Sequence, residues 1–172
     1  MSFIELAKKR YSCRSYGEKK VEKEKLAKIL EAARIAPTGA NLQPQKLIVV
    51  QSEEGLGKIS KAANIYHAPL AIIVCGDTEK AWVRPFDQKK ITDIDVSIIT
   101  THMMLQATDL GLNTVWVCYF KPDVISAEFN LPKNLEPINI LAVGYGTGHA
   151  ELPDRHDQTR KPLSETVCFE HF

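Results

Sequence analysis

Three polar residues at alternate positions, Arg10, Ser12 and Arg14, form the first group in the sequence that could bind a ligand. In extended backbone, alternate side chains point to one side, so two guanidiniums and one hydroxyl would face the same partner. A phosphate group accepts paired hydrogen bonds from arginine and a short one from a hydroxyl. The spacing therefore predicts a phosphate site, although a basic patch that only faces solvent has the same pattern.

A second polar cluster is the loop "PTGANLQP" at residues 37–44. It lies between a helical pattern and a β-branched strand pattern, and it contains two prolines, a glycine, an asparagine and a glutamine. A simple connection needs fewer polar and turn-forming residues than this. The loop is therefore a second candidate for ligand contact.

Helical and strand patterns alternate along the chain and would position both clusters. Helices are expected over 3–10, 22–36, 55–63, 93–110 and 122–130, and strands over 46–51, 68–76, 113–120 and 137–146. Residues 78–90 read as an irregular excursion. Apolar residues occupy most of the circumference of the 93–110 pattern, which indicates a central buried helix that Gly111 ends.

The C-terminal segment from residue 147 onward is polar and has no helical period until a short apolar patch at 167–169. Such an arm cannot build a core of its own. It must lie against the rest of the chain, lie against a second subunit, or stay loose.

Composition limits the classes of function. The 172 residues are 44% hydrophobic, which fits one globular domain spanning 1–172. The 22 Lys and Arg residues nearly balance 21 Asp and Glu residues, so a nucleic-acid partner is not expected. No apolar run is long enough for a membrane span, and the beginning of the chain does not read as a signal peptide. We expect a cytoplasmic protein with four reduced cysteines and no metal.

Five motifs in register resemble the FMN-dependent nitroreductase family. They are "R-x-S-x-R-x-Y" at 10–16, "A-P-T-G-A-N-x-Q-P" at 36–44, "D-L-G-L-N-T-V-W" at 109–116, "G-Y-G" at 144–146 and "R-K-P-L" at 160–163. They cover nearly the whole chain in the family's order. The resemblance implies an α+β fold, with a mostly antiparallel sheet flanked by helices around a long central buried helix. It also implies a homodimer with two FMN sites at the subunit interface, on which the arm 149–172 packs against the partner.

The resemblance also assigns cofactor-binding residues near both ends of the chain. Arg10, Ser12 and Arg14, with Tyr11 between them, match the family's phosphate and flavin contacts, and Arg160 matches a C-terminal phosphate ligand. Many relatives have a second basic residue two positions before that arginine, where this chain has Gln158. The resemblance leaves open whether Lys161 or Arg155 substitutes for it.

In the family, the loop at 37–44 is offered by one subunit to the flavin that the other subunit mainly binds. The matching residues here are Pro37, Thr38, Gly39, Asn41 and Gln43. Asn and Gln can match the alternating donors and acceptors of a flavin ring, and Gly39 lets backbone approach closely. The alternative is that Asn41 and Gln43 only satisfy the backbone of their own turn.

The backbone after the third strand passes the flavin N5 atom in the family, which makes Val117, Cys118 and Tyr119 the matching residues. A cysteine this close to a redox cofactor invites a catalytic interpretation. A lone thiol without an adjacent base or a resolving partner is more often a packing residue. We therefore expect no catalytic side chain.

The resemblance implies an FMN-dependent oxidoreductase that takes hydride from NADH or NADPH and passes it to a nitroaromatic, a quinone or a similar small molecule by a ping-pong mechanism. Two alternatives stay open. One is an FMN enzyme of the same fold with another reaction, such as reductive dehalogenation or enone reduction. The other is a flavin-binding sensor or storage protein without turnover, because only residues 77–90 stand where larger members have long lid-like insertions.

Overall fold

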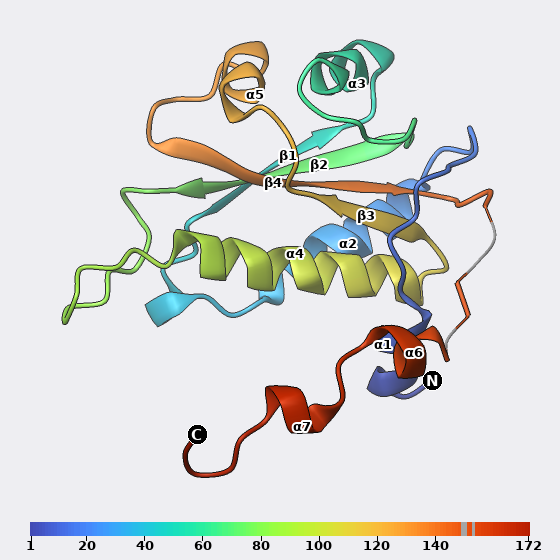
Figure 1. Ribbon diagram of the computed structural model, residues 1–172. Coiled ribbons are helices and arrows are strands. Elements are labelled where there is room, and N and C mark those ends of the chain that lie inside the picture. Colours follow the sequence, from blue (N-terminus) through green and yellow to red (C-terminus); the bar gives the residue numbers. More distant parts are fainter. Residues whose placement is uncertain (149–150, 153) are drawn as a thin grey trace.

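An antiparallel sheet lies at the centre of the fold (Figure 1). The structure, a computed structural model, describes residues 1–148, 151–152 and 154–172. In that part of the chain the sheet has the order β1-β2-β4-β3 and every neighbouring pair is antiparallel. The strands are β1 (Gln45–Val50), β2 (Leu70–Asp77), β3 (Asn113–Val117) and β4 (Leu135–Gly144). β3 is thus an edge strand.

Helices cover both faces of this sheet (Figure 1). α2 (Lys23–Ile35) and α4 (Thr92–Asp109) lie on one face, and α3 (Glu53–Ser60) and α5 (Pro122–Glu128) lie on the other. Alternate residues of β2 supply the two cores: Leu70, Ile72 and Val74 face α2 and α4, whereas Ala71, Ile73 and Cys75 face α3 and α5. All of β2 is buried, which confirms the prediction of a strand covered on both faces.

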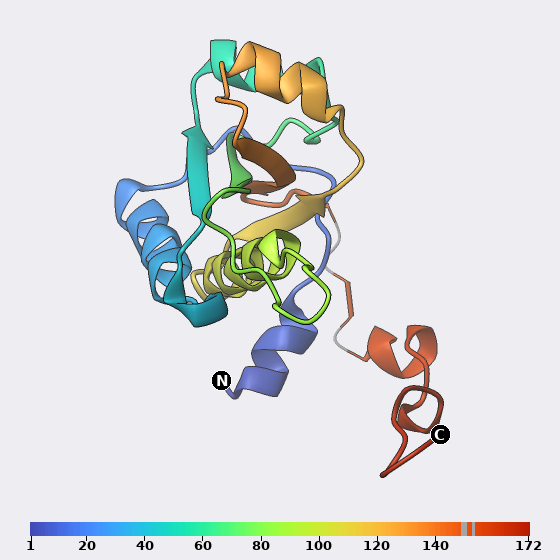
Figure 2. The same cartoon turned by 90° about the vertical axis from the view of Figure 1, so that its left-hand side faces the viewer.

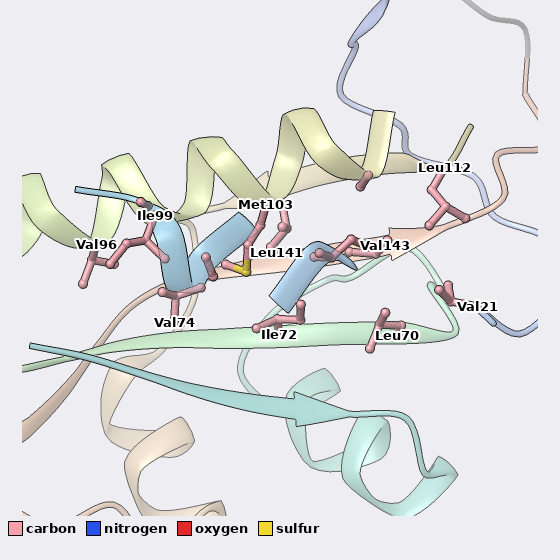
Figure 3. Close-up of a cluster of buried hydrophobic side chains, with 14 residues drawn as sticks. Val21, Leu70, Ile72, Val74, Val96, Ile99, Met103, Leu112, Leu141 and Val143 are labelled. Carbon is pink, nitrogen blue, oxygen red and sulfur yellow. The ribbon is translucent and has the colours of Figure 1, made fainter. Parts of the chain in front are cut away.

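α4 packs one side of its surface against the sheet and α2. Val96, Ile99 and Met103 are fully buried against β2 and β4 (Figure 3). The opposite side stays open in a single chain, where Ile94 is 49% exposed. A groove of about 590 Å³ runs along it, and we call its lining the open α4 face: Asp93, Ile94, Ser97, Ile98, Thr101 and His102. The predicted all-round burial is therefore not reached within one chain.

Local signals explain where several helices begin and end. α1 (Phe3–Lys9) begins with a capping box, in which the Ser2 hydroxyl accepts from the Glu5 N–H and the Glu5 carboxylate accepts from the Ser2 N–H. The Ser52 hydroxyl caps α3 by accepting from the Gly55 N–H, and Pro122 opens α5. After α4, Gly111 adopts a φ of +75°, the left-handed turn that glycine allows at low cost.

The C-terminal arm contains two short helices that the sequence did not predict, α6 (Arg155–Thr159) and α7 (Leu163–Thr166). Neither has a buried residue, so neither shows an apolar period. The arm passes α1 and its end stands clear of the sheet in both views (Figures 1 and 2). Phe169 is 85% exposed there. The arm therefore does not pack on this chain's own core.

Among the described residues, no helix has both the length and the apolar character needed to cross a bilayer.

Candidate functional site

A cavity of about 320 Å³ gathers the predicted phosphate ligands from the two ends of the chain. Its lining, which we call the arginine pocket, is Arg10, Tyr11, Ser12, Arg14, Glu151, Arg155, His156, Thr159 and Arg160. The trio at positions 10, 12 and 14 thus lies together with the C-terminal Arg160, although more than 140 residues separate them in the sequence. The structure thus brings five of the predicted residues to one pocket: Arg10, Tyr11, Ser12, Arg14 and Arg160.

The N-terminal side of the pocket is extended backbone attached to the start of β3. Ser12 forms a parallel bridge with Thr114, and the Cys13 N–H donates to the Thr114 carbonyl at 2.9 Å. Cys13 is 2% exposed, whereas Ser12 and Arg14 are exposed. Cys13 thus faces the core while its neighbours Ser12 and Arg14 line the pocket, as the spacing predicts, and Tyr11 also lines the pocket.

Arg155 fastens the arm to the body beside the pocket. Its guanidinium donates to the carbonyls of Arg10 at 2.7 Å, Leu152 at 2.9 Å and Lys8 at 3.1 Å. The Lys8 carbonyl belongs to the last turn of α1, where a cation is favourable because helix carbonyls lack partners. This side chain is therefore largely committed to backbone and holds α6 against the end of α1.

The pocket carries an excess of positive charge. Its described lining has four arginines and one carboxylate, Glu151. Burial lowers the pKa of Arg10, and the nearby charges of Arg155 and Arg160 lower it further. A bound anion would relieve this repulsion, so the charges fit a phosphate group. No group of three His, Cys, Asp or Glu side chains that could hold a metal is found among the described residues.

The pocket does not include every residue predicted at the C-terminal end. Lys161 lies outside the lining, and its ammonium is 3.7 Å from the Glu165 carboxylate. Gln158 is exposed and also outside the lining. Of the two residues suggested as substitutes for a second basic ligand, only Arg155 reaches the pocket. Sequence reasoning missed His156 and Thr159, because no apolar period marks the short helix α6 that carries them.

The loop at 37–43 is shaped by its own polar groups. The Gln43 N–H donates to the Thr38 hydroxyl at 3.1 Å, and the Gln43 side-chain amide donates to the Asn41 carbonyl at 3.1 Å. Ala40, Asn41 and Gln43 all have positive φ. The Asn41 side chain is exposed and makes no hydrogen bond to another described residue. Gln43 thus serves the turn itself, whereas the Asn41 amide stays available.

Gly39 connects this loop to the beginning of α4. Its N–H donates to the carboxylate of Asp95, a buried acid of α4, at 2.8 Å. A Cβ at position 39 would lie 2.5 Å from Ile91 Cδ1 and 3.1 Å from Trp82 Cβ. Only glycine fits without displacing these neighbours. Pro37, two residues earlier in the loop, is exposed.

The third predicted segment follows β3 directly. Val117 is the last residue of the strand and is buried, whereas Cys118 and Tyr119 are exposed. The Trp116 indole N–H donates to Cys118 Sγ at 3.1 Å, so the thiol has a packing partner. Four residues separate Thr114 from Cys118, about 13 Å of strand. The arginine pocket and this segment therefore lie at the two ends of one edge strand.

The loop at 37–43 is apart from the arginine pocket within one chain. Gly39 contacts Asp95 in the first turn of α4, whereas Arg10 and Tyr11 share a cavity with Thr108 in its last turn. Thirteen helical residues separate the two positions, about 20 Å along the axis. The structure thus divides the predicted site into two parts at opposite ends of α4.

The fold is α+β, and the positively charged arginine pocket lies next to an edge strand. A sequence model described as the nitroreductase family matches residues 7–66 and 60–145. The chain belongs to the nitroreductase family, as its motifs predicted.

Individual relatives agree with this assignment. A nitroreductase family protein from Clostridium difficile 630 is 67% identical, with 100% of both chains covered and a TM-score of 0.99. A structure described as an FMN-dependent nitroreductase from Clostridium difficile R20291 is 29% identical, covers 99% of this chain and 100% of its own, and has a TM-score of 0.84. A protein from Methanothermobacter thermautotrophicus, provisionally named NADH dehydrogenase/NAD(P)H nitroreductase, is 31% identical over 96% of this chain and 88% of its own.

Proposed function

We propose that this chain is an FMN-dependent oxidoreductase that takes hydride from NADH or NADPH and passes it to a nitroaromatic, a quinone or a similar acceptor in a ping-pong reaction. The observation that carries the proposal is the arginine pocket, which lies at the start of the strand whose end is the predicted ring contact. Membership of the nitroreductase family and the names of the relatives support the same activity.

FMN fits the residues at this site. Arg10, Ser12, Arg14 and Arg160 would hold its phosphate group, because their charge is not balanced by the single carboxylate of the lining. The backbone at Cys118 and Tyr119 would lie beside the flavin ring. FMN, when bound, supplies the hydride chemistry, and the protein supplies binding and orientation. No side chain of this chain is assigned a proton-transfer or nucleophilic role.

The two-part site is explained by a homodimer in which the loop at 37–43 faces the flavin that the partner holds. Within one chain the loop lies about 20 Å along α4 from the pocket. Two apolar surfaces are left for a second subunit to cover. One is the open α4 face, where Ile94 is 49% exposed, and the other is the apolar patch of the arm at 167–169, where Phe169 is 85% exposed. The arm would then pack on the partner. We also propose a cytoplasmic location, because the four cysteines are free and disulfides are rare in that compartment.

The test of the activity is flavin content and turnover of the purified protein. We expect a yellow protein with about one FMN per chain, bound without a covalent link. NADH or NADPH oxidation should accelerate when menadione is added. Bound flavin without acceptor-dependent oxidation would support the sensor or storage alternative, and a colourless protein that binds no added FMN would contradict the proposal.

The arrangement across the dimer has its own test in mixed dimers. One parent carries Asn41→Ala and the other carries Arg10→Ala with Ser12→Ala. If phosphate and ring contacts come from different subunits, each mixed dimer has one intact site and one site with both lesions. About half of the sites should then bind FMN with normal affinity. Two equally weakened sites would show that the loop serves its own subunit.

A further inference from the structure

α6 brings a histidine to the arginine pocket as well as the arginines. His156 lines the cavity, and its Nε2 atom is buried without a hydrogen-bond partner among the described residues. A buried polar nitrogen without a partner is rare in folded proteins, because it has lost its contact with water and gained nothing in return. The atom therefore points to a group that completes the site.

Helical spacing explains why His156 reaches the pocket and Gln158 does not. Residues 155, 156 and 159 fall on one side of a helix with 3.6 residues per turn, whereas 157 and 158 fall on the other. The lining follows this pattern, since it includes Arg155, His156 and Thr159. Gln158 thus lies on the side of α6 that faces away from the cavity.

The other residues of the arm that could replace that basic ligand are already engaged. The Arg155 guanidinium donates to three backbone carbonyls. The Thr159 hydroxyl donates to the Arg155 carbonyl at 2.9 Å. Lys161 is outside the lining, near Glu165. Apart from Arg160, His156 is therefore the described arm residue of the lining whose buried ring nitrogen has no hydrogen-bond partner.

We propose that His156 is the second C-terminal ligand of the phosphate group and donates a hydrogen bond from Nε2 to a phosphate oxygen. The inference rests on the proposed function, because it takes the phosphate monoester of FMN as the ligand. The proposal gives a role to His156, a residue that the sequence motifs did not indicate. It also explains how this chain binds phosphate with glutamine at 158.

The experiment compares FMN with riboflavin, which lacks the phosphate group. Full-length protein is stripped of flavin, and both flavins are titrated by fluorescence quenching. His156→Ala should weaken FMN binding about tenfold or more, the range for a hydrogen bond to a charged group, and leave riboflavin affinity within about twofold. His156→Gln, which places an amide N–H near the Nε2 position, should recover most of the loss. Gln158→Ala is the matched control on the same helix and should bind both flavins like the unmodified protein.

The outcomes separate this inference from the proposed function. If His156→Ala binds FMN as tightly as Gln158→Ala does, while the unmodified protein prefers FMN over riboflavin and Arg160→Ala loses that preference, the role of His156 is wrong and the pocket assignment stands. If the unmodified protein does not prefer FMN, both fall. Unchanged riboflavin binding shows that a variant is folded. Equal loss of FMN in the alanine and glutamine variants would also overturn the hydrogen bond.

Discussion

The two ends of α4 carry polar sites of different construction. At its C-terminal end, the arginine pocket gathers four guanidiniums, and burial together with the charges of Arg155 and Arg160 lowers the pKa of Arg10. At its N-terminal end, the loop at 37–43 uses the Thr38 hydroxyl, the Gln43 amide and the Gly39 N–H to fix its own shape. One site needs a ligand to offset its charge, and the other is already satisfied except for Asn41. The pocket should therefore supply most of the affinity for a ligand, and the loop should adjust it.

The largest expected effect comes from removing the C-terminal side of the pocket. A chain ended after Gly148 lacks Arg155, His156 and Arg160, so FMN affinity should fall about a hundredfold or more. The dimer should weaken as well. Flavin content after purification and light scattering measure the two effects. The control ends after Thr166 and keeps the whole pocket. Full flavin occupancy in the chain ended after Gly148 would show that the arginine pocket does not supply most of the affinity for FMN.

A smaller loss of affinity is expected at the loop. Asn41→Ala removes the exposed amide that has no partner within the described chain, at a cost of roughly 1–3 kcal/mol, or about five- to 150-fold in FMN affinity. The thermal midpoint of the flavin-free protein should not change. Gln51→Ala, an exposed amide after β1, is the control. If Asn41→Ala affects FMN no more than this control does, the loop makes no ring contact through that side chain.

The packing beneath the loop is tested by two glycine substitutions. Gly39→Ala places a methyl group 2.5 Å from Ile91 Cδ1 and should destabilise the fold by about 1–3 kcal/mol. Gly57→Ala in α3 meets nothing within 4 Å and should stabilise by about 0.5–1 kcal/mol, because alanine favours helix. Urea unfolding measures both. Equal stability of the two variants would show that the loop can shift to accept a side chain.

The smallest effect concerns a polar network at the C-terminal end of α4. The Lys25 ammonium donates to the Leu110 carbonyl and to the Tyr145 hydroxyl, each at 2.9 Å, and Tyr145 donates to Glu22. Hydrogen bonds from Tyr145 and Lys19 lower the pKa of Glu22 from 4.5 to about 2. Because the folded pKa is the lower one, ionised Glu22 stabilises the fold above about pH 4.5, and this contribution is lost as pH falls towards 2.

Glu22→Gln measures that contribution. The difference in unfolding free energy between the unmodified protein and the variant should be constant near neutral pH and shrink below about pH 4.5. Glu24→Gln on the same helix, for which no such contacts exist among the described residues, is the control. A difference that does not change with pH would mean that the carboxylate gives no ionic stabilisation.

The sequence predicted the regular part of the fold well because its signals are local. Two-sided burial of β2 follows from an uninterrupted apolar run. The end of α4 follows from Gly111, and the beginning of α5 follows from Pro122. The alternation of Arg10, Ser12 and Arg14 was readable for the same reason, since extended backbone has a period of two.

The parts that could not be read depend on contacts between distant segments. The Gln43 side chain turns back to the Asn41 carbonyl in a loop where Ala40, Asn41 and Gln43 all have positive φ. Alanine and glutamine seldom adopt positive φ, so the residue types at positions 40 and 43 did not indicate this backbone conformation. α6 and α7 bury no residue, so no apolar period marks them. The resemblance left open whether Lys161 joins the phosphate ligands, and the structure puts it past the end of α6, outside the pocket lining and near Glu165.

The hydrogen bond from Arg155 to the Arg10 carbonyl joins residues 145 positions apart, and this affects when the pocket can exist during synthesis. Ribosomes add roughly 5–20 residues per second, so Arg10 emerges on the order of ten seconds before Arg155. During that interval α1 and the segment after it lack their clamp, and a nascent chain halted before residue 155 has no complete anion site. The proposed phosphate site is therefore completed late in synthesis, once the segment through Arg160 has emerged.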